Sequence, residues 1–257
     1  DISLFDFTDK MLKVYGDNAI AGIGFYFATL FRDIIIAQHR FFHILNIFGP
    51  KGTGKSEMAV TLLKLFGDLP VGINMTNSTV PAMADHVAHT RNTLCHIDEY
   101  KNSLEFEKIE FLKGLWDGVG RSRMNMEKDR KKEMTAVDAG IMLTGQEMAT
   151  ADNALFSRVL FLSVSKTEFS EEERMRFEEL KRIEKQGLTH ITNKLLKLRR
   201  VFVDEYAPCY NEAVSDVRPH IIAQVEDRIL KNWCVVFTAL RIVTRIEALP
   251  FTYEKTT

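Results

Sequence analysis

The segment Gly49–Ser56 constrains the fold of this chain most strongly, because it reads Gly-Pro-Lys-Gly-Thr-Gly-Lys-Ser. It satisfies every fixed position of the pattern G-x-x-x-x-G-K-[ST], in which glycines let the backbone wrap closely around a phosphate group. Backbone N–H groups at the start of the following helix then point at the anion. Such a loop has to connect a buried strand to a helix, so the neighbouring sequence tests this interpretation.

Both neighbours of the loop fit that context. Phe42–Phe48 is a short apolar run that predicts a buried strand, and Lys55–Phe66 carries apolar residues at helical spacing. We expect Lys55 to reach the β- and γ-phosphates of ATP, and the Ser56 hydroxyl to ligate Mg²⁺. The expected phosphate cradle consists of Gly49, Pro50, Lys51, Gly52, Thr53, Gly54, Lys55 and Ser56.

Short apolar runs alternate with helix-length segments through the middle of the chain. Further strands are predicted at Val71–Met75, Thr93–Ile97, Ala139–Leu143 and Val159–Val164, and further helices at Val80–Thr90 and Glu105–Trp116. Strands joined by helical crossovers predict an α/β fold, with a five-stranded, mainly parallel sheet covered on both faces. Right-handed crossovers place the ligand-binding loops at the carboxyl ends of the strands. We assign residues 42–168 to this nucleotide-binding core.

Residues 1–41 predict a helical N-terminal segment. Thr8 is a candidate cap for a first helix, which ends at Gly16, and Asp17 is a candidate cap for a longer, apolar second helix.

Residues 169–257 predict a C-terminal helical lid domain. Its first helix has a capping signature, since Ser170 is followed three residues later by Glu173. Breaks are predicted near Gly187, Pro208 and Pro219.

Charge and composition exclude several classes of protein. Lys and Arg total 34 against 35 Asp and Glu, a formal net charge of -1, which argues against a uniformly basic protein that coats DNA. The longest uncharged apolar run, residues 19–31, is too short to cross a bilayer, so we expect no membrane partner. Three widely spaced cysteines indicate a reduced, cytoplasmic setting. Because the chain begins with Asp1, we expect a fragment of a longer protein.

Two adjacent carboxylates follow the strand predicted at Thr93–Ile97, where the sequence reads Asp98-Glu99. We expect Asp98 to hold Mg²⁺ and Glu99 to orient and polarise the attacking water. A water-activating carboxylate favours a hydrolysing enzyme over a small-molecule kinase. The alternative is an ordinary exposed turn.

The later strand ends supply three more candidate catalytic residues. Thr144 and Gln146 follow a buried strand, and either is a candidate to sense the γ-phosphate or to hold the water. Arg158 precedes the last strand, where an arginine would project into the nucleotide site of a neighbouring subunit and stabilise transition-state charge. The alternative for Arg158 is an ordinary surface arginine or an intramolecular ion pair.

These elements, in this order, resemble those of the AAA+ ATPases over residues 42–164. The match consists of the phosphate loop, the Asp98-Glu99 pair, the strand that ends at Thr144 and the element Leu155-Phe156-Ser157-Arg158. Within that group, Ile44–Ser56 and the run Thr144-Gly145-Gln146-Glu147 look like the helicase domains of phage- and plasmid-type primase-helicases.

This resemblance implies a P-loop NTPase fold and a replication ATPase that assembles into a ring, with a hexamer expected and a primase module often fused to it. It also implies an arginine at the start of a lid helix that touches the γ-phosphate. Arg228 fits this role better than Arg218. The sensor asparagine that is usual in the family is not evident.

The segment between the acidic pair and the predicted sensor strand is the clearest cationic cluster. Its basic residues are Arg121, Arg123, Lys128, Arg130, Lys131 and Lys132. Similar helicases carry a pore-lining hairpin at this place, where such residues grip the phosphates of single-stranded or forked DNA. The alternative is a solvated hairpin of mixed charge.

The sequence therefore favours an ATP-hydrolysing DNA helicase or translocase domain from a mobile-element or phage-like replication system. A second hypothesis is an ATP-gated switch or loader that acts on DNA or protein partners without unwinding.

Overall fold

A five-stranded sheet lies at the centre of the chain, and every adjacent pair of strands in it is parallel. Its strands, in spatial order, are β2 (Ile73–Asn74), β3 (Arg91–Tyr100), β6 (Asp138–Gly145), β1 (Ile44–Phe48) and β7 (Val159–Ser163). The computed structural model describes residues 1–69, 72–124, 132–221 and 225–253. The alternation of strands and helices in the sequence predicted this α/β sheet correctly.

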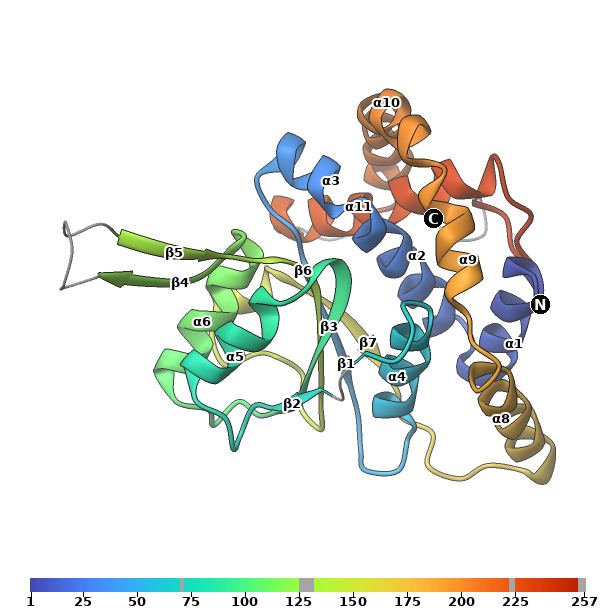
Figure 1. The fold of residues 1–257 in the computed structure, drawn as a ribbon, viewed down its shortest axis with the longest axis horizontal. Helices are drawn as coiled ribbons and strands as arrows, with labels where there is room; N and C mark the ends of the chain where they lie inside the picture. The colour runs from blue at the N-terminus through green and yellow to red at the C-terminus, as the bar shows by residue number, and fades with distance from the viewer. Residues whose placement is uncertain (70–71, 125–131, 222–224, 254–257) are drawn as a thin grey trace.

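Helices account for most of the remaining described chain (Figure 1). In chain order they are α1 (Leu4–Tyr15), α2 (Asn18–Leu30), α3 (Arg32–His39), α4 (Lys55–Lys64), α5 (Val80–Ala88), α6 (Phe106–Trp116), α7 (Asn153–Phe156), α8 (Glu171–Glu184), α9 (Thr189–Leu196), α10 (Arg199–Val217), the 3-10 helix η1 (Arg218–His220) and α11 (Asp227–Thr244).

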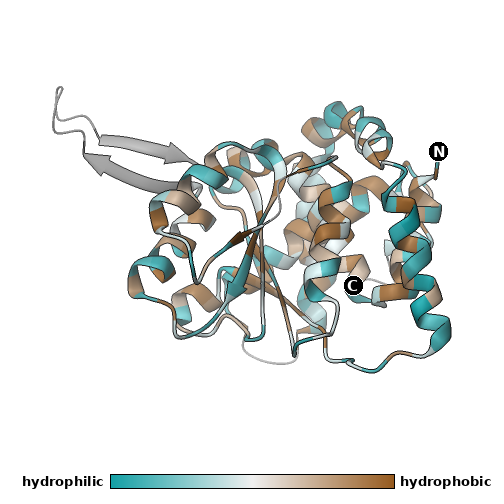
Figure 2. Cartoon of the chain, turned by 60° about the horizontal axis from the view of Figure 1, so that its bottom comes forward, coloured by the Kyte–Doolittle hydropathy of each residue, from teal (hydrophilic) through white to brown (hydrophobic). Residues whose placement is uncertain are grey.

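The two faces of the sheet are covered by different helices, as strands buried on both sides require. Neighbouring residues of β6 show this division. Met142 belongs to a hydrophobic cluster shared with α2 and α4, whereas Ile141 and Leu143 belong to a cluster shared with α5 and α6. Figure 2 shows the hydrophobic residues gathered on the central strands and on the helix faces that pack against them.

The N-terminal and C-terminal helices pack together in one hydrophobic cluster. Helix α2 makes this possible through two glycines. A Cβ at Gly22 would lie 2.7 Å from the Met58 side chain of α4, and one at Gly24 would lie 2.6 Å from Val236 of α11. The missing side chains let α4 and α11 approach the α2 backbone closely.

The helix boundaries correct several sequence predictions in the N-terminal segment. Ser3, not Thr8, caps α1, and Thr8 is buried inside that helix. Asp17 does occupy the cap position of α2, but its side chain makes no capping hydrogen bond. A further break at Phe31, which the sequence did not predict, separates α2 from α3.

The C-terminal helices confirm three predicted features and correct one. The predicted break near Pro219 is the 3-10 helix η1, which follows the end of α10. Ser170 and Glu173 form a reciprocal capping box at the start of α8, and Gly187, with φ +88°, lies in the break before α9. Pro208, however, lies inside α10. Buried residues on either side of it, including Tyr206 and Cys209, hold the helix in place despite the missing backbone donor.

No single described helix is both long and apolar enough to cross a membrane, and the pair α2 and α3, which passes that test jointly, is bent by 81°. The three cysteines, Cys95, Cys209 and Cys234, are buried and free.

Candidate nucleotide site

The loop Gly49–Ser56 connects β1 to α4, as the motif requires. Its glycines are needed for different reasons. A Cβ at Gly49 would lie 1.8 Å from the Val164 carbonyl oxygen, so only glycine fits between β1 and the end of β7. Gly52 and Gly54 adopt positive φ values of +85° and +83°, which favour glycine.

Two side chains of the loop bond to its own backbone. The Thr53 hydroxyl donates a 2.9 Å hydrogen bond to the Pro50 carbonyl, and Lys55 Nζ donates one of 3.1 Å to the same oxygen. The ammonium group of Lys55 therefore lies across the concave side of the loop, where it would meet a phosphate group. Lys55 and Ser56 are the first residues of α4, so the positive end of the helix dipole points at the same place.

Strand register brings the acidic pair to the same edge of the sheet. Phe48 of β1 pairs with Gly145 of β6, and Gly145 pairs with Tyr100 of β3. The phosphate loop, Asp98-Glu99 and Thr144 therefore all lie at the carboxyl ends of adjacent strands, the edge at which parallel sheets bind ligands.

The backbone around the acidic pair is irregular and held in place by hydrogen bonds. The register of β3 against β6 shifts between Ile97 and Tyr100, and Glu99 adopts a positive φ of 63°. The Thr76 hydroxyl donates a 3.1 Å hydrogen bond to the Glu99 carbonyl. A non-glycine residue in this conformation is strained, and such strain persists where the surroundings over-determine it, often at functional sites.

Asp98 is held by hydrogen bonds to one of its carboxylate oxygens. Oδ1 accepts a 2.8 Å bond from the Glu99 backbone N–H and a second bond from the Thr144 hydroxyl. The oxygen of Thr144 also lies 2.7 Å from Nε2 of His96. Burial lowers the pKa of His96, which favours the neutral ring.

The structure distinguishes the two sensor candidates. Thr144 is fully buried, and its hydroxyl is engaged by both Asp98 and His96. Gln146, two residues further on, is exposed at the edge of the sheet beside the phosphate loop. Of the two side chains, Gln146 is the one whose amide is free to turn toward a bound phosphate.

The donor set fits a magnesium ion that is bound together with a phosphate. Mg²⁺ prefers oxygen ligands and keeps several waters, with one or two protein ligands. The Ser56 hydroxyl and the Asp98 carboxylate supply such oxygens at the same edge of the sheet. Among the described residues, no three His, Cys, Asp or Glu side chains gather into a protein-only metal site.

Arg158 lies at the amino ends of the strands, opposite the carboxyl ends that carry the phosphate loop. Its carbonyl accepts a 3.2 Å hydrogen bond from the N–H of Ile44, the first residue of β1, whereas the phosphate loop follows the last residue of that strand. Since β1 has five residues, the two edges are about 15 Å apart. Within one chain, Arg158 does not meet the phosphate loop.

Arg228 lies beside Arg158 and not beside the phosphate loop. Both guanidinium groups lie over the indole ring of Trp116, at 5.0 Å for Arg228 and 5.2 Å for Arg158. Arg228 Nη1 also donates a 2.9 Å hydrogen bond to the Ser157 hydroxyl. The structure does not bring Arg228 to its own chain's phosphate cradle, and the alternative, Arg218, lies in η1 near Cys234 of α11.

The cationic segment is partly described. Arg121 and Arg123 lie on β4 (Val119–Met124), and Lys132 begins β5 (Lys132–Ala136). These strands form the antiparallel hairpin expected before the sensor strand, and it extends away from the sheet (Figure 1). Lys128, Arg130 and Lys131 lie outside the described residues.

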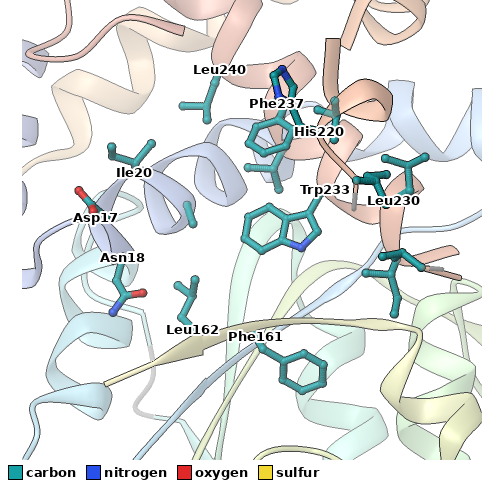
Figure 3. A pocket seen from close by; sticks show the side chains of 16 residues that line it. Asp17, Asn18, Ile20, Phe161, Leu162, His220, Leu230, Trp233, Phe237 and Leu240 are labelled. Atoms are coloured by element: carbon teal, nitrogen blue, oxygen red, sulfur yellow. The ribbon is translucent and has the colours of Figure 1, made fainter. Parts of the chain in front are cut away.

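An apolar groove of about 730 Å³ lies between α2, β7 and α11 (Figure 3). Trp233 and Phe237 of α11 face Phe161 and Leu162 of β7 across it. No Lys or Arg is among the described residues that line it, so it lacks the charges that would hold a triphosphate.

Sequence reasoning did not identify three residues that contact the candidate site residues or their neighbours. His96 was visible only as a polar interruption of an apolar strand. Trp116 packs partly buried against the main hydrophobic cluster, and two arginine guanidinium groups also lie over its ring. Asn232 accepts a 3.3 Å hydrogen bond from the Trp116 indole and donates one of 2.9 Å to the Ser157 carbonyl, and nothing in its sequence context indicated this role.

No model of a known protein family matches the chain, and no curated protein matches it. Among solved structures, the chain is similar to one titled "SCCmec type IV Cch - active helicase", with 15% sequence identity and a TM-score of 0.70. The similarity covers 99% of this chain and 49% of that chain, so this chain spans about half the length of the matching structure. At this identity the likeness shows the fold, which is α/β and P-loop NTPase-like.

Proposed function

We propose that this chain is the ATP-hydrolysing motor domain of a DNA helicase or translocase of the AAA+ type, from a mobile-element or phage-like replication system. The phosphate loop and the Asp98-Glu99 pair lie at one edge of the parallel sheet, which supports nucleotide hydrolysis. The fold is shared with a structure whose title names an active helicase, which supports a motor acting on nucleic acid.

Each residue at the loop edge has a distinct role in this proposal. Lys55 and the backbone N–H groups bind the β- and γ-phosphates, while Ser56 and Asp98 hold Mg²⁺. When bound, the metal neutralises charge on the phosphates. Glu99 orients and polarises the attacking water, and Gln146 contacts the γ-phosphate or that water.

The observation that carries the proposal is the separation of the arginines from the phosphate loop. A single chain places Arg158 and the loop at opposite edges of its sheet. A second copy could dock with the amino ends of its sheet strands against the phosphate loop of the first copy. Its arginines would then supply positive charge to that nucleotide site. Repetition of this head-to-tail contact closes a ring, for which we propose a hexamer.

Arg228 belongs to the same surface in this scheme. Because it stacks on Trp116 beside Arg158, we assign both arginines to the nucleotide site of the neighbouring subunit. Stacking on the Trp116 ring fixes the two guanidinium groups relative to each other. In this proposal, their contact with the neighbouring nucleotide site couples hydrolysis in one subunit to the position of the next.

The β4–β5 hairpin supplies the DNA contact in this proposal. An otherwise near-neutral chain concentrates basic residues there, including Arg121, Arg123 and Lys132. Such residues bind backbone phosphates without reading sequence.

The experiment that tests the proposed function measures ATP hydrolysis with and without single-stranded DNA, together with the molar mass by light scattering. We expect DNA to stimulate hydrolysis and the mass to be that of a ring when nucleotide is bound. Lys55→Ala should abolish nucleotide binding, and Glu99→Gln should retain binding while stopping turnover. Hydrolysis by a DNA-indifferent monomer would support an ATP-gated switch or loader instead, and normal turnover by Glu99→Gln would refute the water-activation role.

A further inference from the structure

We propose that His96 is a positioning residue for the magnesium-binding carboxylate, acting on Asp98 through the hydroxyl of Thr144. This inference rests on the proposed function, because it concerns the same metal. His96 and Asp98 lie on β3, and Thr144 lies on the adjacent strand β6. The three side chains form a continuous chain of hydrogen bonds, with 2.7 Å between His96 Nε2 and Thr144 Oγ1.

The direction of these hydrogen bonds follows from the protons that are available. An ionised carboxylate only accepts, so Thr144 donates its single hydroxyl proton to Oδ1 of Asp98. The Thr144 oxygen then accepts from His96, which therefore carries its proton on Nε2. Nδ1 of His96 is buried and has no hydrogen-bond partner among the described residues, which agrees with an unprotonated nitrogen.

Burial makes this chain of bonds hard to replace by water. Thr144 is 0% exposed and His96 is 4% exposed. If His96 did not donate to Thr144, the Thr144 hydroxyl would be free to rotate away from Asp98 and to donate elsewhere. The imidazole thus holds the hydroxyl in the orientation that serves the carboxylate.

The consequence for Asp98 is a fixed orientation of its carboxylate. Oδ1 accepts from both Thr144 and the Glu99 backbone, so rotation of the group is blocked. The other oxygen, Oδ2, is then the one directed to the metal and its water shell. Groups that orient a ligating side chain in this way strengthen metal binding without contacting the metal.

Gly72 holds the imidazole from the side opposite Thr144. A Cβ at this position would lie 2.4 Å from Nδ1 of His96 and 2.9 Å from its carbonyl oxygen. The chain just before β2 therefore packs directly against the ring, and any side chain there would push His96 out of line with Thr144.

The test uses two matched pairs of variants. Thr144→Val keeps the shape and removes the hydroxyl, whereas Thr144→Ser keeps the hydroxyl. His96→Leu removes the donor, whereas His96→Gln provides an amide N–H near the position of Nε2. The readout is the affinity for a fluorescent, non-hydrolysable ATP analogue, measured in EDTA and at increasing Mg²⁺ concentrations, with a thermal melt of each variant as a folding control.

We expect Thr144→Val and His96→Leu to require roughly 10-fold more Mg²⁺ to reach half of the Mg²⁺-dependent gain in nucleotide affinity. Affinity in EDTA should be unchanged, and Thr144→Ser and His96→Gln should behave like the wild type. The double variant Thr144→Val/His96→Leu should match Thr144→Val alone, since His96 acts through Thr144. If His96→Leu does not fold, His96→Asn, whose shorter side chain also lacks a donor at the position of Nε2, replaces it in both comparisons.

Three outcomes overturn the inference in distinguishable ways. Equal Mg²⁺ dependence in the wild type and in Thr144→Val would refute the positioning role while leaving the proposed function intact. The same holds for additive effects of the two substitutions, which would mean that His96 does not act through Thr144. A wild-type chain that binds the analogue with no dependence on Mg²⁺ would refute both the inference and the proposed metal site.

Discussion

The guanidinium group of Arg228 donates a 2.9 Å hydrogen bond to the hydroxyl of Ser157, the residue immediately before Arg158. This contact joins the first turn of α11 to the residues just before β7. The two bonded residues lie 71 positions apart in the chain. It places both arginines on one surface, away from the phosphate loop of their own chain. The assignment of this surface to a neighbouring subunit can be tested directly.

Arg158→Ala and Arg228→Ala should each reduce ATP turnover while leaving nucleotide binding by the isolated chain unchanged. Removal of a transition-state arginine costs on the order of 10³-fold or more in kcat, and we expect the larger loss for Arg158→Ala. Arg200→Ala is the matched control, because Arg200 is exposed on α10 and pairs with Asp204 one turn away.

Mixtures of subunits separate a role across the interface from a role within one chain. Arg158→Ala subunits retain an intact phosphate loop, and Lys55→Ala subunits retain an intact arginine surface. Mixing the two should restore part of the turnover that each lacks. Complete inactivity at every mixing ratio, with assembly confirmed by light scattering, would show that Arg158 acts within its own chain.

Charge reversal on the described part of the hairpin should weaken binding to single-stranded DNA. The double variant Arg121→Glu/Arg123→Glu removes two cations from β4, so the slope of log affinity against log salt should become shallower by roughly one per lost phosphate contact. Fluorescence anisotropy with a labelled oligonucleotide at several salt concentrations measures this slope. Arg200→Glu is the control, and an equal change in the two variants would reject a specific role for the hairpin.

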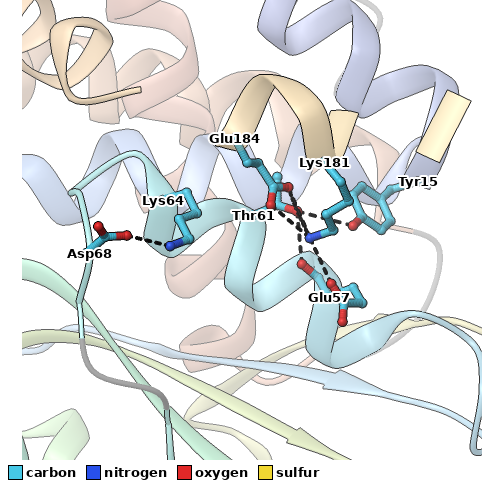
Figure 4. Close-up of polar contacts among 7 residues, drawn as sticks. All are labelled: Tyr15, Glu57, Thr61, Lys64, Asp68, Lys181 and Glu184. Atoms are coloured by element: carbon cyan, nitrogen blue, oxygen red, sulfur yellow. Dashed lines mark hydrogen bonds and ion pairs between the residues drawn. The ribbon is translucent and has the colours of Figure 1, made fainter. Parts of the chain in front are cut away.

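A polar cluster connects α8 to the helix that follows the phosphate loop (Figure 4). Glu184, 6% exposed, accepts a 2.6 Å hydrogen bond from the Thr61 hydroxyl and pairs with Lys181 at 2.9 Å. Lys181 also pairs with Glu57 at 2.8 Å. Residues on α8 are thereby bound to the first and second turns of α4.

Glu184→Ala should lower the free energy of unfolding by about 2 kcal/mol, because it removes the acceptor of the buried Thr61 hydroxyl and one of the two carboxylates that pair with Lys181. Glu184→Gln should cost less, since an amide oxygen still accepts from Thr61. Urea denaturation measures both. Asp68→Ala, which breaks an exposed pair with Lys64 on the same helix, should have no measurable effect. A loss in Asp68→Ala as large as that in Glu184→Ala would contradict this explanation.

Acid should destabilise the chain through His43. The ring lies in the core beside Phe25 and Phe42, and neither nitrogen has a hydrogen-bond partner in the part of the chain that the structure describes. Burial lowers the pKa of His43 to about 3. Between that value and the unfolded pKa of about 6.5, the unfolded state binds more protons, so stability falls as the pH falls.

From pH 7 to pH 5, the loss due to His43 should be about 2 kcal/mol. His43→Leu should remove this part of the loss, whatever its effect on stability at pH 7. Urea denaturation of both proteins at the two pH values gives the difference. His39, whose pKa burial lowers to about 4, remains in both proteins and supplies a residual slope. An unchanged loss in His43→Leu would show that the imidazole is hydrated in the native state.

Local patterns predicted the sheet and the loop because their physical causes are local. Gly49–Ser56 needs only its own glycines and its two neighbouring segments to define a phosphate loop, and both segments have the expected structure. The capping box of Ser170 and Glu173 is equally local. The break predicted at Pro208 was wrong because its neighbours Tyr206 and Cys209 contact residues that are distant in the sequence, His39 and Arg245, and no local pattern reveals those contacts.

The amino-acid sequence by itself determined that this chain forms a parallel sheet with a phosphate loop, and that two carboxylates follow a neighbouring strand, since such features arise from residue type and spacing along the chain. Only the tertiary structure decided that His96 supports Thr144 and Asp98, and that Arg228 joins Arg158 on Trp116. These relationships depend on contacts between residues 42 to 112 positions apart. The physical reason is that packing brings such residues within hydrogen-bonding or stacking distance, and no spacing rule along a single chain encodes that distance.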